Sequence, residues 1–287
     1  MNHQPRARRA QEQVGRLRRT SAALLPRAAV SLIAAVLASC AAVSRPAIHS
    51  EPERLEVARR LAKDREWLSA IEQLKTYIER NGGSAQVDEA IYLLGECYLK
   101  SKDYPNAAVE FERLLSDFPE SDSSAAAAYG LGEALYGQSR PPDFDQDYTT
   151  KALDQWERYR REYTWHWRVP EAERRIAKCR AQLASKMLNT AELYLKLRQI
   201  DPARVYFRAV DQDYGDTPQA GDAMIGLARC DALEGRTAEA VAYLKDLETR
   251  YAGQPLAARA ARERARIERM GTVKPQHETH RIPSDQR

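Results

Sequence analysis

The sequence predicts an all-α fold, a superhelical solenoid of about five helical hairpins and a capping helix, without strands. The first observation is a recurrent pair, in which a small residue is followed four residues later by a large apolar one. The pairs are Ala70 and Leu74, Ala107 and Phe111, Ala152 and Trp156, Ala203 and Phe207, and Ala240 and Leu244. The second observation is the separation of these pairs, which is 37, 45, 51 and 37 residues. Internal repeats of this length are typical of helical solenoids.

One segment, residues 94–119, has the pattern of the tetratricopeptide repeat, which is about 34 residues long. Gly95 and Ala107 are small, as expected where two antiparallel helices touch, and Tyr98 and Phe111 fill the space around them. Pro119 ends the second helix. Because the separations exceed the repeat length, we expect longer helices or loops in the middle of the chain.

Two such insertions can be located. Residues 138–148 contain two prolines and several acidic and amide residues, which predicts a loop between the helices of hairpin three. From Pro170 to about Arg198 no breaker interrupts the helical spacing of apolar residues. We expect one long helix there, joining hairpins one to three rigidly to hairpins four and five. Residues 256–270 alternate alanine with charge, which predicts a solvated capping helix.

The start of the chain has the pattern of an export signal. Residues 1–39 contain seven arginines and one glutamate, followed within that range by an apolar segment over residues 28–38. This segment is too short to span a bilayer, which takes ~20 helical residues. The rest of the chain carries 38 basic and 40 acidic side chains. The basic charge therefore belongs to the leader and gives no reason to expect a nucleic-acid partner.

The leader ends in Leu37-Ala38-Ser39-Cys40, which resembles the lipobox of bacterial lipoproteins. The resemblance implies cleavage before Cys40 and several acyl chains, palmitate among them, on that cysteine. Several chains give stable attachment, whereas one binds only marginally. Ala41 and Ala42, rather than aspartate, follow, which in lipoproteins favours the outer membrane. The alternative is a buried cysteine at the end of an uncleaved helix.

These patterns divide the chain into four parts. We expect a signal peptide over residues 1–39, a lipidated linker over 40–50, the solenoid over 51–270 and a disordered polar tail over 271–287, because the tail has too little apolar content to fold.

Catalytic and metal-binding patterns are not found in the sequence. It has no Gly-x-Ser-x-Gly elbow, His-Glu-x-x-His helix or Walker loop. Gly130 and Gly132 match the start of a dinucleotide fingerprint, but Gly132 occupies a small-residue position of hairpin three, so we interpret both as packing positions. Only His277 and His280 are close in sequence, and a polar tail is a poor preformed metal site. We expect no enzyme activity, metal or cofactor.

Three cysteines lie beyond Cys40. Cys97 and Cys230 occupy equivalent positions three hairpins apart, too distant to bond, and we expect both to be small core residues. Cys179 lies in the long helix, and the odd count leaves at least one thiol free.

An aromatic segment precedes the long helix. Tyr163, Trp165 and Trp167 surround His166 there. Aromatic residues of this kind often anchor a partner. We favour the alternative that they cap the core of hairpin three, because tryptophan is mostly core or half-buried.

A repeat solenoid exposes a concave groove that is lined by fixed positions of each first helix. Tyrosine with mixed charge at those positions suits an extended peptide. The candidate peptide-binding residues of hairpins one to three are Arg59, Lys63, Tyr92, Glu96, Lys100, Tyr129, Glu133 and Tyr136. Hairpins four and five offer Glu192, Lys196 and Arg229.

Three segments, taken with the lipobox, resemble the BamD family, the tetratricopeptide lipoproteins of the machinery that assembles β-barrel outer-membrane proteins. They are DREWLSAIEQL (64–74), DEAIYLLGECYLKSKDYPNAAVEF (88–111) and DYTTKALDQWERY (147–159). The resemblance covers about residues 51–255. It implies an outer-membrane anchor facing the periplasm and a POTRA-containing barrel partner bound through the later hairpins. It further implies that the early hairpins meet unfolded outer-membrane proteins, alongside other assembly lipoproteins.

The chain departs from the family pattern at two places. Hairpins three and four end in Tyr163-Thr164 and Tyr214-Gly215, where the family usually has Tyr-Pro. An arginine associated with partner contact is often found before the hairpin-four aromatic residue, and this chain has a tyrosine there. The candidate partner interface is Arg204, Tyr206, Arg208 and Arg229.

Two other functions are weighed against assembly of β-barrels. A general tetratricopeptide lipoprotein adaptor, which serves an envelope protease, peptidoglycan or cell-division factors, would use the same groove. An enzyme such as a helical lytic transglycosylase would need a catalytic domain with an acid glutamate, and we expect no room for one after residue 270.

Overall fold

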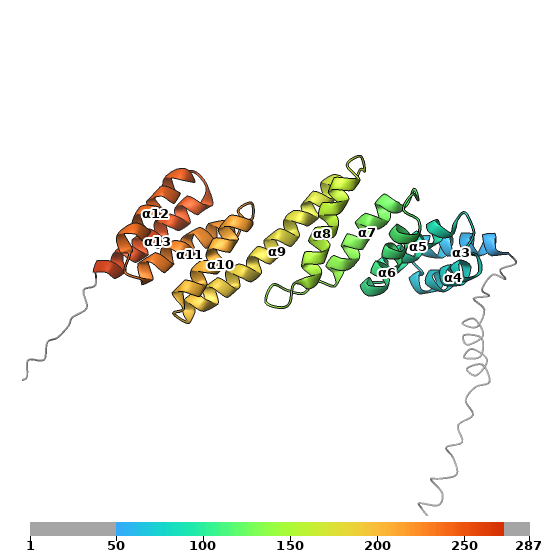
Figure 1. Ribbon diagram of the computed structural model, residues 1–287, viewed down its shortest axis with the longest axis horizontal. Coiled ribbons are helices and arrows are strands. Elements are labelled where there is room, and N and C mark those ends of the chain that lie inside the picture. Colours follow the sequence, from blue (N-terminus) through green and yellow to red (C-terminus); the bar gives the residue numbers. More distant parts are fainter. Residues whose placement is uncertain (1–49, 273–287) are drawn as a thin grey trace, which may run out of the picture. The chain divides into compact units, whose positions relative to one another are not determined.

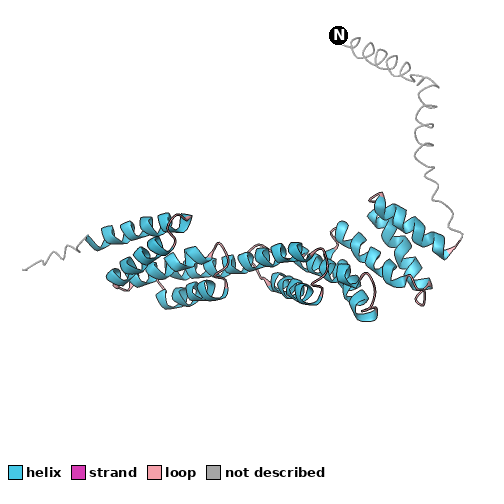
Figure 2. Cartoon of the chain, turned by 90° about the horizontal axis from the view of Figure 1, so that it is seen from above, coloured by secondary structure: helices cyan, strands magenta, loops and turns pink. Residues whose placement is uncertain are grey.

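The computed structural model describes residues 50–272, which belong to one compact unit and form eleven α-helices without a strand (Figure 1). Figure 2 shows helices joined by loops throughout this part of the chain. The helices are α3 (Glu51–Lys63), α4 (Trp67–Arg80), α5 (Val87–Lys100), α6 (Tyr104–Asp117), α7 (Ser124–Gly137), α8 (Asp147–Glu162), α9 (Val169–Lys196), α10 (Ile200–Asp213), α11 (Ala220–Leu233), α12 (Thr237–Arg250) and α13 (Pro255–Thr272). The predicted all-α tetratricopeptide solenoid is confirmed over the described residues.

The helices pack in chain order, each against the next (Figure 1). Consecutive pairs from α3/α4 to α11/α12 make the five predicted hairpins, and α13 packs on α12 and α11 as the capping helix. Contacts between first helices, such as α3 with α5 and α5 with α7, join successive hairpins.

The predicted repeat positions form the core. All ten residues of the five recurrent pairs have no exposed surface. Glycines in the first helices let the large partners approach closely. The Phe111 ring lies between Gly95 of α5 and Gly130 of α7, where a Cβ atom on either glycine would come within 2.7 Å of the ring. Gly132 faces Trp156, and Gly226 faces Phe207, in the same way. The packing interpretation of Gly130 and Gly132 is therefore confirmed.

Four hairpins turn through one residue with a left-handed backbone. These residues are Arg65, Lys102, Arg198 and Gly235, with φ of 64°, 66°, 61° and 84°. In each case the next residue's N–H donates to the carbonyl five residues earlier, as in Glu66 to Leu61 at 2.8 Å and Asp103 to Tyr98 at 2.9 Å. This is the Schellman ending of a helix, which usually takes glycine. Three of the four turns hold arginine or lysine instead, so no glycine marks them in the sequence.

Hairpin three turns through a loop over residues 138–146 between α7 and α8, two residues shorter than the predicted 138–148 because Asp147 and Tyr148 open α8. The long helix is also confirmed, because α9 runs for 28 residues. Its first half packs Ala172, Ile176 and Cys179 with Trp156 and Tyr159. Its second half packs Ala184, Ala191 and Leu195 with Phe207 in a separate cluster. One helix thus carries the core from hairpin three to hairpin four.

The ends of the described part refine the predicted boundaries. Helix α3 begins after Ser50, whose side chain accepts a hydrogen bond from the Glu53 N–H at 3.3 Å. Helix α13 ends at Thr272, close to the predicted boundary between solenoid and tail. The predicted leader, Cys40 and most of the predicted tail lie outside the described residues. No helix over residues 50–272 is both long and apolar enough to span a bilayer.

Candidate functional site

A pocket of about 290 Å³ lies between the first two hairpins and contains four of the eight predicted groove residues. Helix α3 contributes Arg59 and Lys63, and α5 contributes Glu96 and Lys100. The apolar part of the lining is Ala62, Trp67, Leu93 and Cys97. Helical spacing brings each pair together, because residues four apart lie on the same face. The structure therefore assembles the early part of the predicted groove.

The charged groups of this pocket differ in what they already contact. The Arg59 guanidinium donates to both carboxylate oxygens of Glu89 at 3.1 and 2.6 Å and is also paired with Glu56. Burial opposes the charge of Arg59, but these two carboxylates outweigh it and raise the arginine's pKa. Lys63 is exposed. Lys100 is also exposed, and neither lysine makes an ion pair within the described residues. The two ammonium groups are the cations of the pocket that remain open to a ligand.

The tyrosines of hairpins two and three lie deeper than predicted. Tyr92 is half-buried against Phe111, with ring centroids 6.1 Å apart, and burial, followed by the charge of Glu96, raises its pKa to about 12. Tyr129 is only 4% exposed and contacts the Trp156 and Tyr159 rings. Its prediction as a peptide-contacting residue is wrong, because its ring completes the core of hairpin three.

Helix α9 engages the other predicted residues of hairpin three. Glu133 forms an ion pair with Arg175 at 2.8 Å, and burial raises the pKa of Glu133 while the Arg175 charge opposes that rise. The Tyr136 hydroxyl donates to the Gln182 side-chain oxygen at 3.1 Å. These two side chains therefore join hairpin three to the long helix and are not free to contact a peptide.

The α8–α9 loop adds a cation that the sequence did not single out. The Arg168 guanidinium lies 4.9 Å from the Tyr129 ring centroid and 4.8 Å from that of Trp167. Trp165 and Trp167 are 74% and 75% exposed, so the favoured interpretation that they cap the core is wrong. Tyr163 does pack against the core, where its ring lies 5.5 Å from that of Tyr159. Because the loop has no helical period, its sequence cannot predict which of its aromatic residues are buried and which are exposed.

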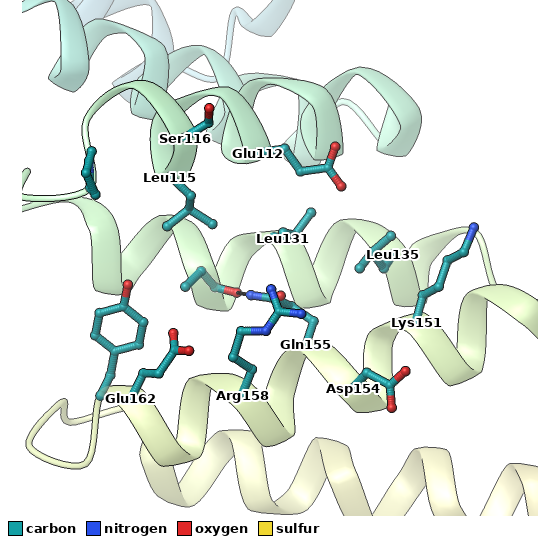
Figure 3. Close-up of a pocket in the computed structure, with 13 residues that line it drawn as sticks. Glu112, Leu115, Ser116, Leu131, Leu135, Lys151, Asp154, Gln155, Arg158 and Glu162 are labelled. Carbon is teal, nitrogen blue, oxygen red and sulfur yellow. Dashed lines mark hydrogen bonds between the residues drawn. The ribbon is translucent and has the colours of Figure 1, made fainter.

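A second and larger pocket, of about 620 Å³, lies between α6, α7 and α8 (Figure 3). Leu115, Leu131 and Leu135 provide its apolar part, and Figure 3 shows α7 between the other two helices. Its charged lining combines Glu112, Lys151, Asp154, Arg158 and Glu162. The sequence did not indicate this pocket, because its residues lie outside the positions expected to line the concave groove.

The candidate partner interface lies in hairpins four and five. Arg204 pairs with Asp231 and Glu234, both at 2.7 Å, and so joins α10 to the end of α11. Tyr206 stacks on Tyr194 of α9 with ring centroids 5.6 Å apart. Arg208 is exposed and makes no ion pair within the described residues.

Arg229 belongs to both predicted groups. It pairs with Glu192 of α9 at 2.6 Å and approaches Glu263 of α13 at 3.9 Å. Lys196, at the end of α9, is exposed. The structure brings Arg229 and Glu192 together, and both side chains already satisfy each other's charge.

Within residues 50–272 no cluster of histidine, cysteine, aspartate or glutamate could hold a metal ion. Cys97, Cys179 and Cys230 are free and fully buried, which confirms the core interpretation of Cys97 and Cys230. Burial raises the pKa of Cys97 and Cys179 to about 12 and that of Cys230 to about 11, so the three thiols are poor nucleophiles.

Comparison with known proteins yields one family and several structures. The model of a family described as "YfiO: Outer membrane lipoprotein" matches residues 51–236, which is more than half of the chain. No curated protein matches the chain at a significant level. Among solved structures, a putative kinesin light chain with tetratricopeptide-like repeats from Podospora anserina is 14% identical, covers 78% of this chain and 97% of its own, and has a TM-score of 0.36. A thermophilic tetratricopeptide protein from Thermus thermophilus is 20% identical, with coverages of 75% and 98% and a TM-score of 0.33.

Proposed function

Because this chain belongs to the YfiO family of outer membrane lipoproteins, we propose that it is an outer-membrane-anchored scaffold on the periplasmic face, of the BamD type, that takes part in assembly of β-barrel proteins. Cys40 carries the lipid anchor. The scaffold binds a POTRA-containing barrel subunit through hairpins four and five and unfolded outer-membrane proteins through hairpins one and two. It performs no chemistry of its own.

The observation that carries this proposal is the family match over residues 51–236, which extends from α3 to the turn between α11 and α12. The pocket of Arg59, Lys63, Glu96 and Lys100 supports the substrate site. An extended peptide laid across α3 and α5 would meet the Trp67 and Leu93 side chains and two unpaired ammonium groups. Acidic groups on the peptide would then fix its direction.

The pocket's ion pairs decide which residues test the substrate site. Reversing the charge of Arg59 would leave Glu89 and Glu56 facing a third carboxylate and would disturb the contact of α3 with α5. Lys63 and Lys100 carry no such role. We predict that Lys63→Glu with Lys100→Glu lowers site-specific crosslinking to an unfolded outer-membrane protein by roughly threefold or more, since each exposed charge contributes about 0.2–1 kcal/mol.

A matched control makes the same change of net charge elsewhere. Lys102 and Lys245 are exposed and lie outside both described pockets, so Lys102→Glu with Lys245→Glu should leave crosslinking unchanged. If both double variants crosslinked equally well, the peptide would not bind in this pocket. The assignment of the later hairpins to the barrel subunit would be unaffected by that result.

A further inference from the structure

The loop between α8 and α9 presents the most exposed aromatic side chains of the described residues. Trp165 and Trp167 are 74% and 75% exposed, compared with 47% for Phe144 and 40% for Tyr148. Neighbouring exposed apolar side chains can mark a contact surface, and each indole could remove a substantial apolar area from water.

The loop that carries these two exposed tryptophans is held firmly against the core of hairpin three. His166 is hydrogen-bonded through Nδ1 to the hydroxyl of the buried Tyr159 and accepts from the Arg168 N–H at 3.4 Å. Arg168 in turn lies over Tyr129, and Tyr163 packs on Tyr159. The two indoles therefore project from a fixed base, so a contact through them orders only two side chains and costs little conformational entropy.

The segment that carries this loop is basic, whereas the described residues as a whole are acidic. Residues 157–175 contain six arginines and four glutamates, whereas residues 50–272 together contain 34 basic and 38 acidic side chains. Arg158 and Arg160 are exposed and make no ion pair within the described residues. The two exposed indoles follow closely in sequence on the unpaired guanidinium groups near the end of α8, a combination that suits a surface with an apolar layer beneath anionic groups.

We propose that this loop touches the phospholipid surface of the membrane, with Trp165 and Trp167 at the level of the headgroups and Arg158 and Arg160 near lipid phosphates. Indole rings favour the boundary between water and lipid because they join an apolar body to a polar N–H. Basic side chains add attraction to anionic lipids. A bilayer is the occupant we favour because the family consists of outer membrane lipoproteins. The inference rests on that membership and not on the role in barrel assembly.

The test uses the full lipidated chain in vesicles of phosphatidylethanolamine and phosphatidylglycerol that include a phosphatidylcholine with brominated acyl chains. Bromine quenches indole fluorescence only at short range. We expect quenching in the unchanged chain and loss of most of it in Trp165→Phe with Trp167→Phe. Trp156 is fully buried and Trp67 is half-buried, so neither should replace the lost signal.

Charge variants provide the matched comparison. Arg158→Gln with Arg160→Gln should reduce quenching in vesicles that contain phosphatidylglycerol. Arg208→Gln with Lys245→Gln, which alters two exposed cations in hairpins four and five, should not. Absence of quenching in the unchanged chain, or equal quenching with and without the two tryptophans, would overturn the proposal. So would loss of a co-purifying protein from the tryptophan variant without any quenching, because the loop would then contact protein. None of these readouts requires the barrel subunit.

Discussion

Gly132 shows how closely single residues determine the packing of a repeat. A Cβ atom there would approach the Trp156 indole nitrogen to 2.4 Å and two ring carbons to 2.6 and 2.8 Å. Trp156 has no exposed surface and cannot move aside. We predict that Gly132→Ala lowers the free energy of unfolding by about 1–3 kcal/mol, the usual cost of overpacking. Denaturant unfolding followed by circular dichroism measures it.

Gly83 is the matched control for this substitution. A Cβ atom on Gly83 would meet nothing within 4 Å. Gly83→Ala should therefore leave stability within about 0.5 kcal/mol of the unchanged chain. If Gly132→Ala were as well tolerated as Gly83→Ala, the described contact between α7 and α8 would be incorrect.

The buried thiols give a second residue-scale prediction. Folding raises the pKa of Cys97 and Cys179 to about 12, well above the value of ~8.5 in an unfolded chain. Below pH 8 each thiol is protonated in both states and stability is unaffected. Above that, only the unfolded chain releases the protons, so stability falls with rising pH by about 1.4 kcal/mol per pH unit for each thiol.

Two measurements check this behaviour. The free energy of unfolding at pH 8 should exceed that at pH 10, and Cys97→Ala should reduce the difference. At pH 8 the native chain should leave Cys97, Cys179 and Cys230 unmodified by iodoacetamide, and all three should react in guanidinium chloride. Rapid modification of any of them under native conditions would contradict their full burial.

At the scale of single side chains, sequence patterns predicted the core better than the candidate site. The five pairs from Ala70 to Leu244 are all buried because their period follows from helix geometry. The groove positions follow the same period, but exposure also depends on long-range partners. Tyr129 became a core residue because Trp156 and Tyr159 lie against it, and Glu133 became a structural ion pair because α9 brings Arg175 beside it. Neither partner can be assigned from local spacing.

At the scale of elements, the Gln182 side chain of the long helix contacts several groups of the α7–α8 loop. The Gln182 amide group lies within hydrogen-bonding distance of Ser139 Oγ at 2.7 Å, the Arg140 carbonyl at 2.8 Å and the Gln146 side-chain oxygen at 2.8 Å. Gln146 in turn donates to the Pro141 carbonyl at 2.8 Å. Residues 138–146 are thus ordered by a polar network, which the composition of the loop could not reveal.

We predict that Gln182→Ala loosens this loop without unfolding the hairpins. Leaving half-buried acceptors without a donor costs about 1–3 kcal/mol. Amide hydrogen exchange over residues 138–146 should accelerate. Gln138→Ala is the control, because the Gln138 amide donates to the Ala134 carbonyl of α7 and not to this network. Unchanged exchange in the Gln182 variant would show that the network does not hold the loop.

Element boundaries were predictable where the sequence contains a breaker or a long uninterrupted period. The loop after Gly137 and the 28-residue α9 are examples. The turns at Arg65, Lys102 and Arg198 were not, because a left-handed residue other than glycine leaves no compositional mark. Packing of the flanking helices holds these residues in a conformation that they would not choose alone.

At the scale of the whole molecule, the solenoid separates a packed core from an exposed surface of the kind that repeat proteins use for binding. The large side chains of the repeats, such as Phe111, Trp156 and Phe207, are all fully buried between helices. What remains exposed is a set of charged and aromatic groups on successive hairpins, among them Lys63, Trp165 and Arg208. In the proposed role, distinct partners would occupy different hairpins at the same time.

The measurement that tests this account most directly is purification of the tagged, lipidated protein from its own envelope in mild detergent, with mass spectrometry of the proteins that co-elute. We predict a POTRA-containing β-barrel protein in stoichiometric amount, and its loss when Arg208→Glu alters the exposed cation of hairpin four. Reproducible absence of such a protein, with an envelope protease or a cell-division factor in its place, would contradict the assembly role and favour a general adaptor.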